Sequence, residues 1–274
     1  MSFVNLFVHW NVDPEIFNVG GFAIRWYGLL FMLGFVFSYQ ILKPIFKKEN
    51  VSVELLDKLS MYIGIGTIVG ARLGHCLFYE PGYYLAHPVE ILMIQQGGLA
   101  SHGGAIGIIL ALWLFVRKYK IDQYAWWIDR LALVIPLSGA MIRLGNLMNS
   151  EIFGLPTEKP WGFYFDRLPL EIASVPHHPT QIYEASFYLL CFGIMTWLFF
   201  KKKAHQKPWF MFGVLLTLIF GFRMVVEFWK EDQEGQQATA LFNLGQLLSI
   251  PFLLVGIYLI FKSLKSENTA KAID

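Results

Sequence analysis

Long apolar runs alternate with short polar segments along most of the chain. Runs of roughly twenty residues, the length of helix needed to cross the hydrocarbon core of a bilayer, lie at 21–42, 59–79, 99–116, 125–149, 181–200, 209–228 and 241–261. This pattern predicts an all-α polytopic membrane protein with seven transmembrane helices in one membrane domain, residues 1–274. The proline-rich 150–180 segment predicts an ordered outer loop or small cap rather than a further helix.

The basic residues predict the orientation of the chain, because cytoplasmic loops are enriched in Lys and Arg. Fourteen basic residues follow the first, third, fifth and seventh runs, whereas the alternate connections carry only Lys159, Arg167 and Lys230. The first twenty residues carry none. We therefore expect the N-terminus outside the cell membrane and the C-terminus in the cytoplasm.

Composition agrees with a membrane location. The chain is 55% hydrophobic and 15% charged, with a mean hydropathy of +0.48, values outside the range of an ordinary soluble domain. Its two cysteines, Cys76 and Cys191, both fall in apolar runs and indicate no disulfide framework. The sequence has no basic patch interleaved with aromatic residues and no HExxH or Cys-rich spacing, so we expect neither a nucleic-acid partner nor a metal.

Polar residues within the predicted spans gather at the outer ends of the helices. Such groups are costly in lipid, so they are expected to face the bundle interior or a water-filled cavity. Helical spacing places Arg143 and Asn146 on one face, and Arg223 and Glu227 on another. The set comprises Arg25, Arg72, His75, His102, Arg143, Asn146, Asn149, Glu151, His178, Gln181, Tyr183, Glu184, Arg223, Glu227, Asn243 and Gln246.

Two interpretations apply to Arg143 and Arg223. One is a structural ion pair, with Glu151 and Glu227 as the obvious partners. That interpretation is strong for Arg223, four residues before Glu227, and weaker for Arg143, whose neighbours on its helix face are neutral. The other is binding of a lipid phosphate, which a guanidinium at headgroup depth can hold by two parallel hydrogen bonds.

The segment GGLASHGGAIG, residues 97–107, also allows two interpretations. Gly103 and Gly107 have the spacing of a close helix–helix contact. Alternatively, the bare backbone lets a ligand approach His102 at the start of a helix. The sequence leaves both open.

The stretch RLGNLMNSEIFG, residues 143–154, resembles the signature G-R-x-G-N-F-x-N-x-E-x-x-G of bacterial prolipoprotein diacylglyceryl transferases. Further matches in the order of that family are IRWYG (24–28), GARLGHCLFYEP (70–81), GGLASHGGAIG (97–107), HPTQIYE (178–184), FRMVVEF (222–228) and LGQLLSIP (244–251). The chain departs from the family pattern at Ile142, Leu147 and His177, and in WKEDQEG after FRMVVEF.

The resemblance implies a multi-pass enzyme of the bacterial inner membrane whose active site faces the outer leaflet. It would transfer the diacylglyceryl group of phosphatidylglycerol to the lipobox cysteine of a prolipoprotein signal peptide, releasing glycerol phosphate without a cofactor. By the same resemblance, Arg143 is the main phosphate ligand, Arg223 a second essential arginine and His102 the candidate base. The implied supporting and substrate-binding residues are Tyr27, Asn146, Glu151, Gly154, Gln181, Tyr183 and Glu227.

Two other classes of membrane protein remain as alternatives. In a transporter or channel, intramembrane charge marks a permeation path, but here the charged residues do not continue into the cytoplasmic half. The two halves also lack a matching pair of Gly/Pro-interrupted spans. In a scaffold held by structural ion pairs, exchanging Arg223 and Glu227 would restore function.

Overall fold

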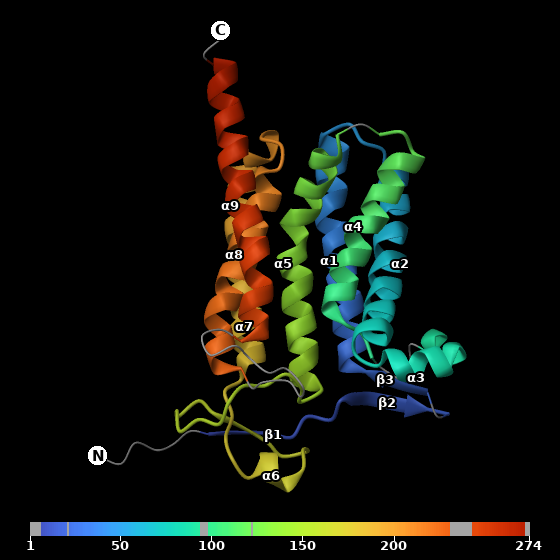
Figure 1. Cartoon of the computed structure of the whole chain (residues 1–274), viewed down its shortest axis with the longest axis vertical. Coiled ribbons are helices and arrows are strands. Elements are labelled where there is room, and N and C mark those ends of the chain that lie inside the picture. The colour runs from blue at the N-terminus through green and yellow to red at the C-terminus, as the bar shows by residue number, and fades with distance from the viewer. Residues whose placement is uncertain (1–6, 21, 94–97, 122, 231–242, 272–274) are drawn as a thin grey trace. The chain divides into compact units, whose positions relative to one another are not determined.

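Long helices dominate a computed structural model of the chain, which describes residues 7–20, 22–93, 98–121, 123–230 and 243–271. Short elements connect them: helices α3 (Pro81–Ala86) and α6 (Leu170–Ala173), and 3-10 turns η1 (Pro88–Leu92), η3 (Ala204–Gln206) and η4 (Glu227–Trp229). The long helices (Figure 1) are α1 (Trp26–Lys48), α2 (Val53–Phe78), α4 (Ser101–Lys118), α5 (Tyr124–Met148), α7 (Thr180–Phe200), α8 (Phe210–Val226) and α9 (Leu244–Lys271).

Six helical segments in the described residues are long and apolar enough to cross a membrane. A mostly helical, polytopic membrane protein is therefore confirmed. Helix α4, which corresponds to the predicted run at 99–116, is not among the six; it has 18 residues, with Arg117 and Lys118 in its last turn. The six are Trp26–Lys48, Val53–Phe78, Tyr124–Met148, Thr180–Phe200, Phe210–Trp229 and Gly245–Lys265.

The long elements are all helices, as the all-α prediction requires, and two small sheets accompany them. Strand β1 (Val8–Trp10) pairs in parallel with β4 (Phe163–Phe165), and β2 (Glu15–Val19) pairs with β3 (Phe22–Arg25) as an antiparallel hairpin. Strands of three to five residues are too short for a clear alternation of polar and apolar positions. The β1–β4 pairing also joins distant parts of the sequence, which local patterns cannot reveal.

The chain divides into two compact units, residues 39–128 and residues 1–38 with 129–274. In the 39–128 unit, α2 and α4 pack backbone against backbone. A Cβ placed on Gly70 would lie 2.8 Å from the Cα of Gly107, and one on Gly74 would lie 2.7 Å from the Cα of Gly103. This confirms the close-packing interpretation of Gly103 and Gly107.

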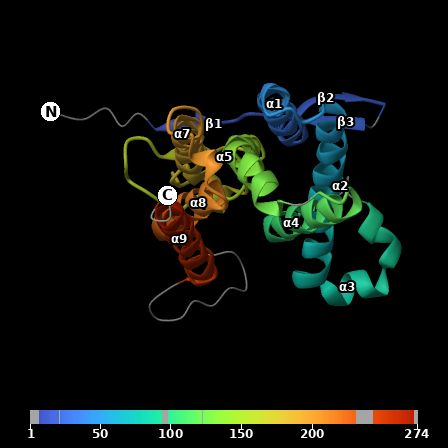
Figure 2. The same ribbon diagram turned by 90° about the horizontal axis from the view of Figure 1, so that it is seen from above.

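In the other unit, α7, α8 and α9 pack side by side (Figures 1 and 2). Asp129, near the start of α5, is completely buried and accepts hydrogen bonds from the backbone N–H groups of Trp209 (2.7 Å) and Phe212 (2.8 Å). Backbone N–H groups at the start of a helix have no partner within that helix. The Asp129 carboxylate therefore caps α8 from a neighbouring helix.

The 150–180 segment is a cap built on the end of α5. Phe163 and His177 exchange two backbone hydrogen bonds of 2.9 Å, and Trp10 donates from Nε1 to the carbonyl of Leu147 at 3.0 Å. Leu147, Phe163 and Phe165 form its small buried core. The cap thus holds the chain that leaves α5 against the start of α7.

Candidate active site

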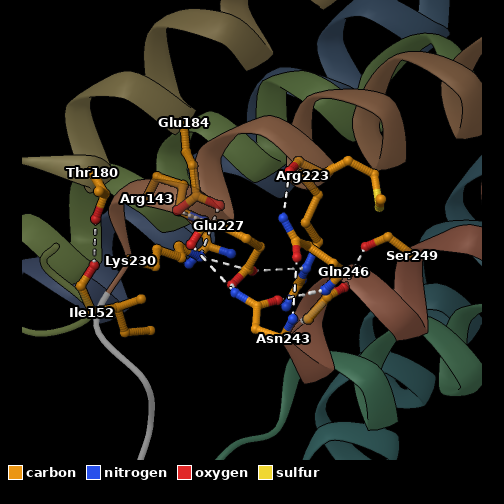
Figure 3. A network of polar contacts seen from close by, with 12 residues as sticks. Arg143, Ile152, Thr180, Glu184, Arg223, Glu227, Lys230, Asn243, Gln246 and Ser249 are labelled. Carbon is orange, nitrogen blue, oxygen red and sulfur yellow. Dashed lines mark hydrogen bonds and ion pairs between the residues drawn. The ribbon is translucent and has the colours of Figure 1, made fainter. Parts of the chain in front are cut away.

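Polar side chains from α5, α7, the end of α8 and the start of α9 converge in one region of the unit formed by residues 1–38 and 129–274 (Figure 3). The Nε of Arg143 lies 3.2 Å from Oε2 of Glu184 on α7, and its Nη1 donates to Oδ1 of Asn146 at 3.2 Å. The Arg143 and Glu184 side chains are 12% and 1% exposed. The residue beside Arg143 on its own helix face, Asn146, is neutral, as the sequence indicated, and the carboxylate paired with Arg143 comes from another helix.

A second ion pair joins Arg223 to Glu227, with 3.3 Å between Nε and Oε1, which confirms the predicted i, i+4 pair. Lys230 connects the two pairs: its Nζ donates to Oε1 of Glu184 at 3.2 Å and lies 3.8 Å from Oε1 of Glu227. The result is a continuous ion-pair chain, Arg143–Glu184–Lys230–Glu227–Arg223 (Figure 3).

Lys230 was absent from the predicted site, because it was counted only among the basic residues of the alternate connections. Its side chain is in fact 10% exposed. Burial lowers the pKa of Lys230, while the nearby Glu184 carboxylate opposes that shift. Glu184 was recognised as a polar residue of the outer helix ends but was not assigned a role.

The turn that follows α5 brings Glu151 back towards Arg143. Asn146 donates from Nδ2 to Oε1 of Glu151 at 2.8 Å, and Gln181 donates from Nε2 to the Glu151 carbonyl at 2.8 Å. Ser150 and Ile152 adopt left-handed backbone conformations, with φ of 53° and 58°, which cost energy in non-glycine residues. This strained turn places the predicted Asn146, Glu151 and Gln181 in one hydrogen-bonded network with Arg143.

Tyr27, at the start of α1, packs against Gly145 of α5, where a Cβ would lie 2.9 Å from Cδ2 of the tyrosine. Its hydroxyl lies within electrostatic reach of Arg143 and Glu151. The structure therefore brings the predicted Tyr27 to the same region.

Gly154 lies where the cap meets the segment after α8. It forms an isolated antiparallel bridge with Lys230, and its N–H donates to the carbonyl of His178 at 2.9 Å. The N–H of Leu155 donates to the carbonyl of Trp229 at 2.9 Å. A Cβ on Gly154 would overlap the Trp229 carbonyl oxygen, so glycine is required for this approach.

The start of α9 fixes the end of α8. Asn243 and Gln246 form a reciprocal cap, in which Gln246 N donates to Asn243 Oδ1 (2.8 Å) and Asn243 N donates to Gln246 Oε1 (3.1 Å). Asn243 also donates from Nδ2 to the Glu227 carboxylate at 3.4 Å. This cap orients the carboxylate that pairs with Arg223.

Two predicted residues lie in other surroundings. The hydroxyl of Tyr183 accepts from Nε1 of Trp161 at 2.7 Å, so its proton is available to Nδ1 of His178 at 3.0 Å. Burial lowers the pKa of His178, and Lys159 lowers it further. His102 is exposed in the first turn of α4, in the 39–128 unit. The substrate-binding role of Tyr183 and the catalytic role of His102 stay predictions.

Several buried polar atoms around Glu151 and Glu184 have hydrogen-bonding capacity that the described part of the chain does not use. They are Asn149 Oδ1, Ser150 Oγ, Gln181 Oε1 and Glu184 Oε2, the last of which contacts Arg143 only as an ion pair. Buried polar groups are normally hydrogen-bonded, so this region is suited to a polar ligand. Among the described residues, no group of three His, Cys, Asp or Glu side chains is placed to hold a metal.

The model of the prolipoprotein diacylglyceryl transferase family matches residues 14–262. The chain belongs to this family. The phosphatidylglycerol–prolipoprotein diacylglyceryl transferase of Tolumonas auensis is 48% identical over 258 residues, covering 94% of this chain and 98% of its own. The protein of the same name from Porphyromonas gingivalis is 46% identical, covering 97% and 98%, and that from Chloroherpeton thalassium is 40% identical, covering 97% of both chains. The resemblance inferred from RLGNLMNSEIFG is thus confirmed.

Proposed function

We propose that this chain transfers the diacylglyceryl group of phosphatidylglycerol to the lipobox cysteine of prolipoproteins. The thiol sulfur attacks the glycerol carbon that carries the phosphate, a thioether bond forms, the carbon–oxygen bond breaks and glycerol phosphate leaves. Membership of the family and the names of relatives that match nearly the whole chain support this reaction.

One observation carries the proposal to the site: two guanidinium groups from different helices, Arg143 on α5 and Arg223 on α8, lie in one cluster of ion pairs. Each pairs with its carboxylate through Nε, and a guanidinium has five N–H donors in total. Both arginines therefore bind the lipid phosphate and stabilise the negative charge that grows on the leaving group.

The other predicted residues have supporting roles in this proposal. Asn146, Glu151, Gln181 and Tyr27 orient Arg143, and Glu227 orients Arg223. His102 accepts the thiol proton, because a neutral imidazole is the usual proton acceptor near pH 7. Gly154 positions the segment that carries Lys230, and Tyr183 contributes to substrate binding from the cap.

The membrane arrangement follows from the distribution of basic residues. We infer one membrane domain with seven spans, α4 being the additional span, the N-terminus outside and the C-terminus in the cytoplasm. The polar helix ends then lie at the outer leaflet of the bacterial inner membrane. That placement gives the site access to both phosphatidylglycerol and the signal peptide of a translocated prolipoprotein.

The test is incubation of the purified protein with labelled phosphatidylglycerol and a lipobox peptide. We expect a thioether-linked lipopeptide and an equal amount of glycerol phosphate, with no product from a peptide carrying serine in place of cysteine. Arg143→Ala is expected to slow transfer by about a hundredfold or more. The matched control is Arg25→Ala, because Arg25 is 59% exposed and pairs only loosely with Glu15 at 3.4 Å. Absence of thioether product with the wild type, or equal rates for the two variants, would refute the proposal.

A further inference from the structure

Lys230 is held in place by its backbone as well as by its charge. It follows η4 directly, and its bridge to Gly154, together with the hydrogen bond between Leu155 and Trp229, attaches this segment to the cap. The close approach of Gly154 to the Trp229 carbonyl fixes the distance between the two segments. These contacts therefore fix the backbone of Lys230 against the cap, and with it the point from which the Lys230 side chain extends.

The ammonium group of Lys230 contacts the carboxylates of both arginine pairs. It lies 3.2 Å from Glu184 and 3.8 Å from Glu227, and all three side chains are at most 10% exposed. At such low exposure, removal of one ion-pair partner leaves the other charge poorly compensated. Without Lys230, the cation paired with Glu184 would be Arg143, and the cation paired with Glu227 would be Arg223.

The charge balance of the cluster depends on this lysine. The ion-pair chain contains three cations, Arg143, Arg223 and Lys230, and two carboxylates, Glu184 and Glu227. Glu151 is connected to Arg143 through Asn146, and with it the net charge of the six side chains is zero. Loss of Lys230 would make the same group negative, and a negative site repels a phosphate.

From this arrangement we propose that Lys230 is a positioning residue that acts through Glu184 and Glu227. By sharing both carboxylates, it leaves the guanidinium groups of Arg143 and Arg223 able to bind an anionic headgroup. The inference rests on the proposed function, because it assigns the phosphate of the lipid as the anion that is bound.

The experiment measures inhibition of transfer by glycerol phosphate, the released product, in the purified full-length protein. Lys230→Met is expected to weaken inhibition about tenfold or more, since hydrogen bonds to charged groups contribute on that scale. Lys230→Arg should restore binding to near the wild-type value. The control is Lys201→Met, which makes the same change at an exposed lysine at the end of α7.

A double variant separates charge compensation from a purely structural contact. Lys230→Met with Glu184→Gln removes one positive and one negative charge, so the original charge balance returns and inhibition should recover by at least severalfold over Lys230→Met alone. No recovery would overturn the inference, as would unchanged inhibition in Lys230→Met. If Lys230→Met does not fold, Glu184→Gln alone decides: it should bind glycerol phosphate at least as tightly as the wild type, and weaker binding would overturn the inference. Failure of the proposed function would be distinguishable, because the wild type itself would then form no thioether.

Discussion

The approach of Gly154 to the Trp229 carbonyl leaves no room for a side chain. In Gly154→Ala, the new Cβ would overlap that oxygen and would lie 2.7 Å from Cγ2 of Thr180 and 2.9 Å from Cβ of His178. Ordinary carbon contacts are about 3.5 to 4 Å, so the two segments must separate by roughly 1 Å. Overpacking of this kind costs about 1 to 3 kcal/mol.

The same displacement should reach the ion-pair chain. Trp229 immediately precedes Lys230, whose Nζ lies only 3.2 Å from Glu184. A shift of roughly 1 Å would stretch this contact to the limit of an ion pair, about 4 Å. We therefore expect Gly154→Ala to slow transfer at least about tenfold, as for loss of a charged hydrogen bond, and to lower the melting temperature by about 2 to 10 °C.

The assay combines thermal unfolding of the purified protein with the initial rate of thioether formation. Gly193→Ala on α7 is the matched control, because a Cβ there meets nothing within 4 Å. Alanine is also favoured over glycine inside a helix, so the control should keep its activity and its melting temperature. If Gly154→Ala behaves like Gly193→Ala in both measurements, the close approach does not position the site.

Four further outcomes are expected. Arg143→Lys should lose transfer about a hundredfold, measured as the initial rate, because an ammonium cannot reproduce the planar guanidinium. His102→Gln should flatten the dependence of kcat/KM on pH near neutrality, because the proton acceptor is lost. Asp129→Ala should lower the free energy of unfolding by about 1 to 3 kcal/mol, because two hydrogen bonds to α8 are lost. It should not slow transfer, since Arg143 lies ~20 Å from Asp129 along the same helix. The pKa of His178 is lowered in the folded state. Neutral His178 should therefore stabilise the protein above about pH 6.5, and this contribution is lost as the pH falls through the folded pKa. Melting curves of His178→Asn should show a smaller loss of stability at acid pH than those of the wild type.

Each of these expectations has a contrary result. Wild-type rates in Arg143→Lys would show that any cation suffices at that position. A complete pH–rate profile in His102→Gln would exclude the base assignment, and unchanged unfolding of Asp129→Ala would show that α8 needs no cap from α5. An equally steep acid decline in His178→Asn would locate the titrating group elsewhere.

Both site arginines are paired with carboxylates, as a scaffold held by structural ion pairs would also have them. Exchange of Arg223 and Glu227 cannot distinguish an enzyme from a structural scaffold, because Glu227 also contacts Lys230 and Asn243. An arginine at position 227 would face the lysine, so the exchange would disturb even a scaffold. Thioether formation by the wild type, and its loss in Arg143→Ala, remains the decisive comparison.

The sequence by itself determined the features that depend on local pattern. Apolar runs predicted the long helices, since a helix that crosses hydrocarbon must satisfy its backbone internally and be apolar over its length. Spacing along single helices predicted the contacts of Arg143 with Asn146 and of Arg223 with Glu227. The motif RLGNLMNSEIFG identified the family, because its residue types and order are specific without knowledge of the fold.

Only the tertiary structure decided the partners that come from other elements. Glu184 reaches Arg143 because α5 and α7 present these faces to each other, and the relative rotation of two helices is not encoded in either periodicity. Lys230 enters the site because Gly154 lets a cap segment approach the end of α8. The short strands and the cap on α8 from Asp129 likewise join distant segments, and such contacts depend on packing of the whole unit rather than on local preference.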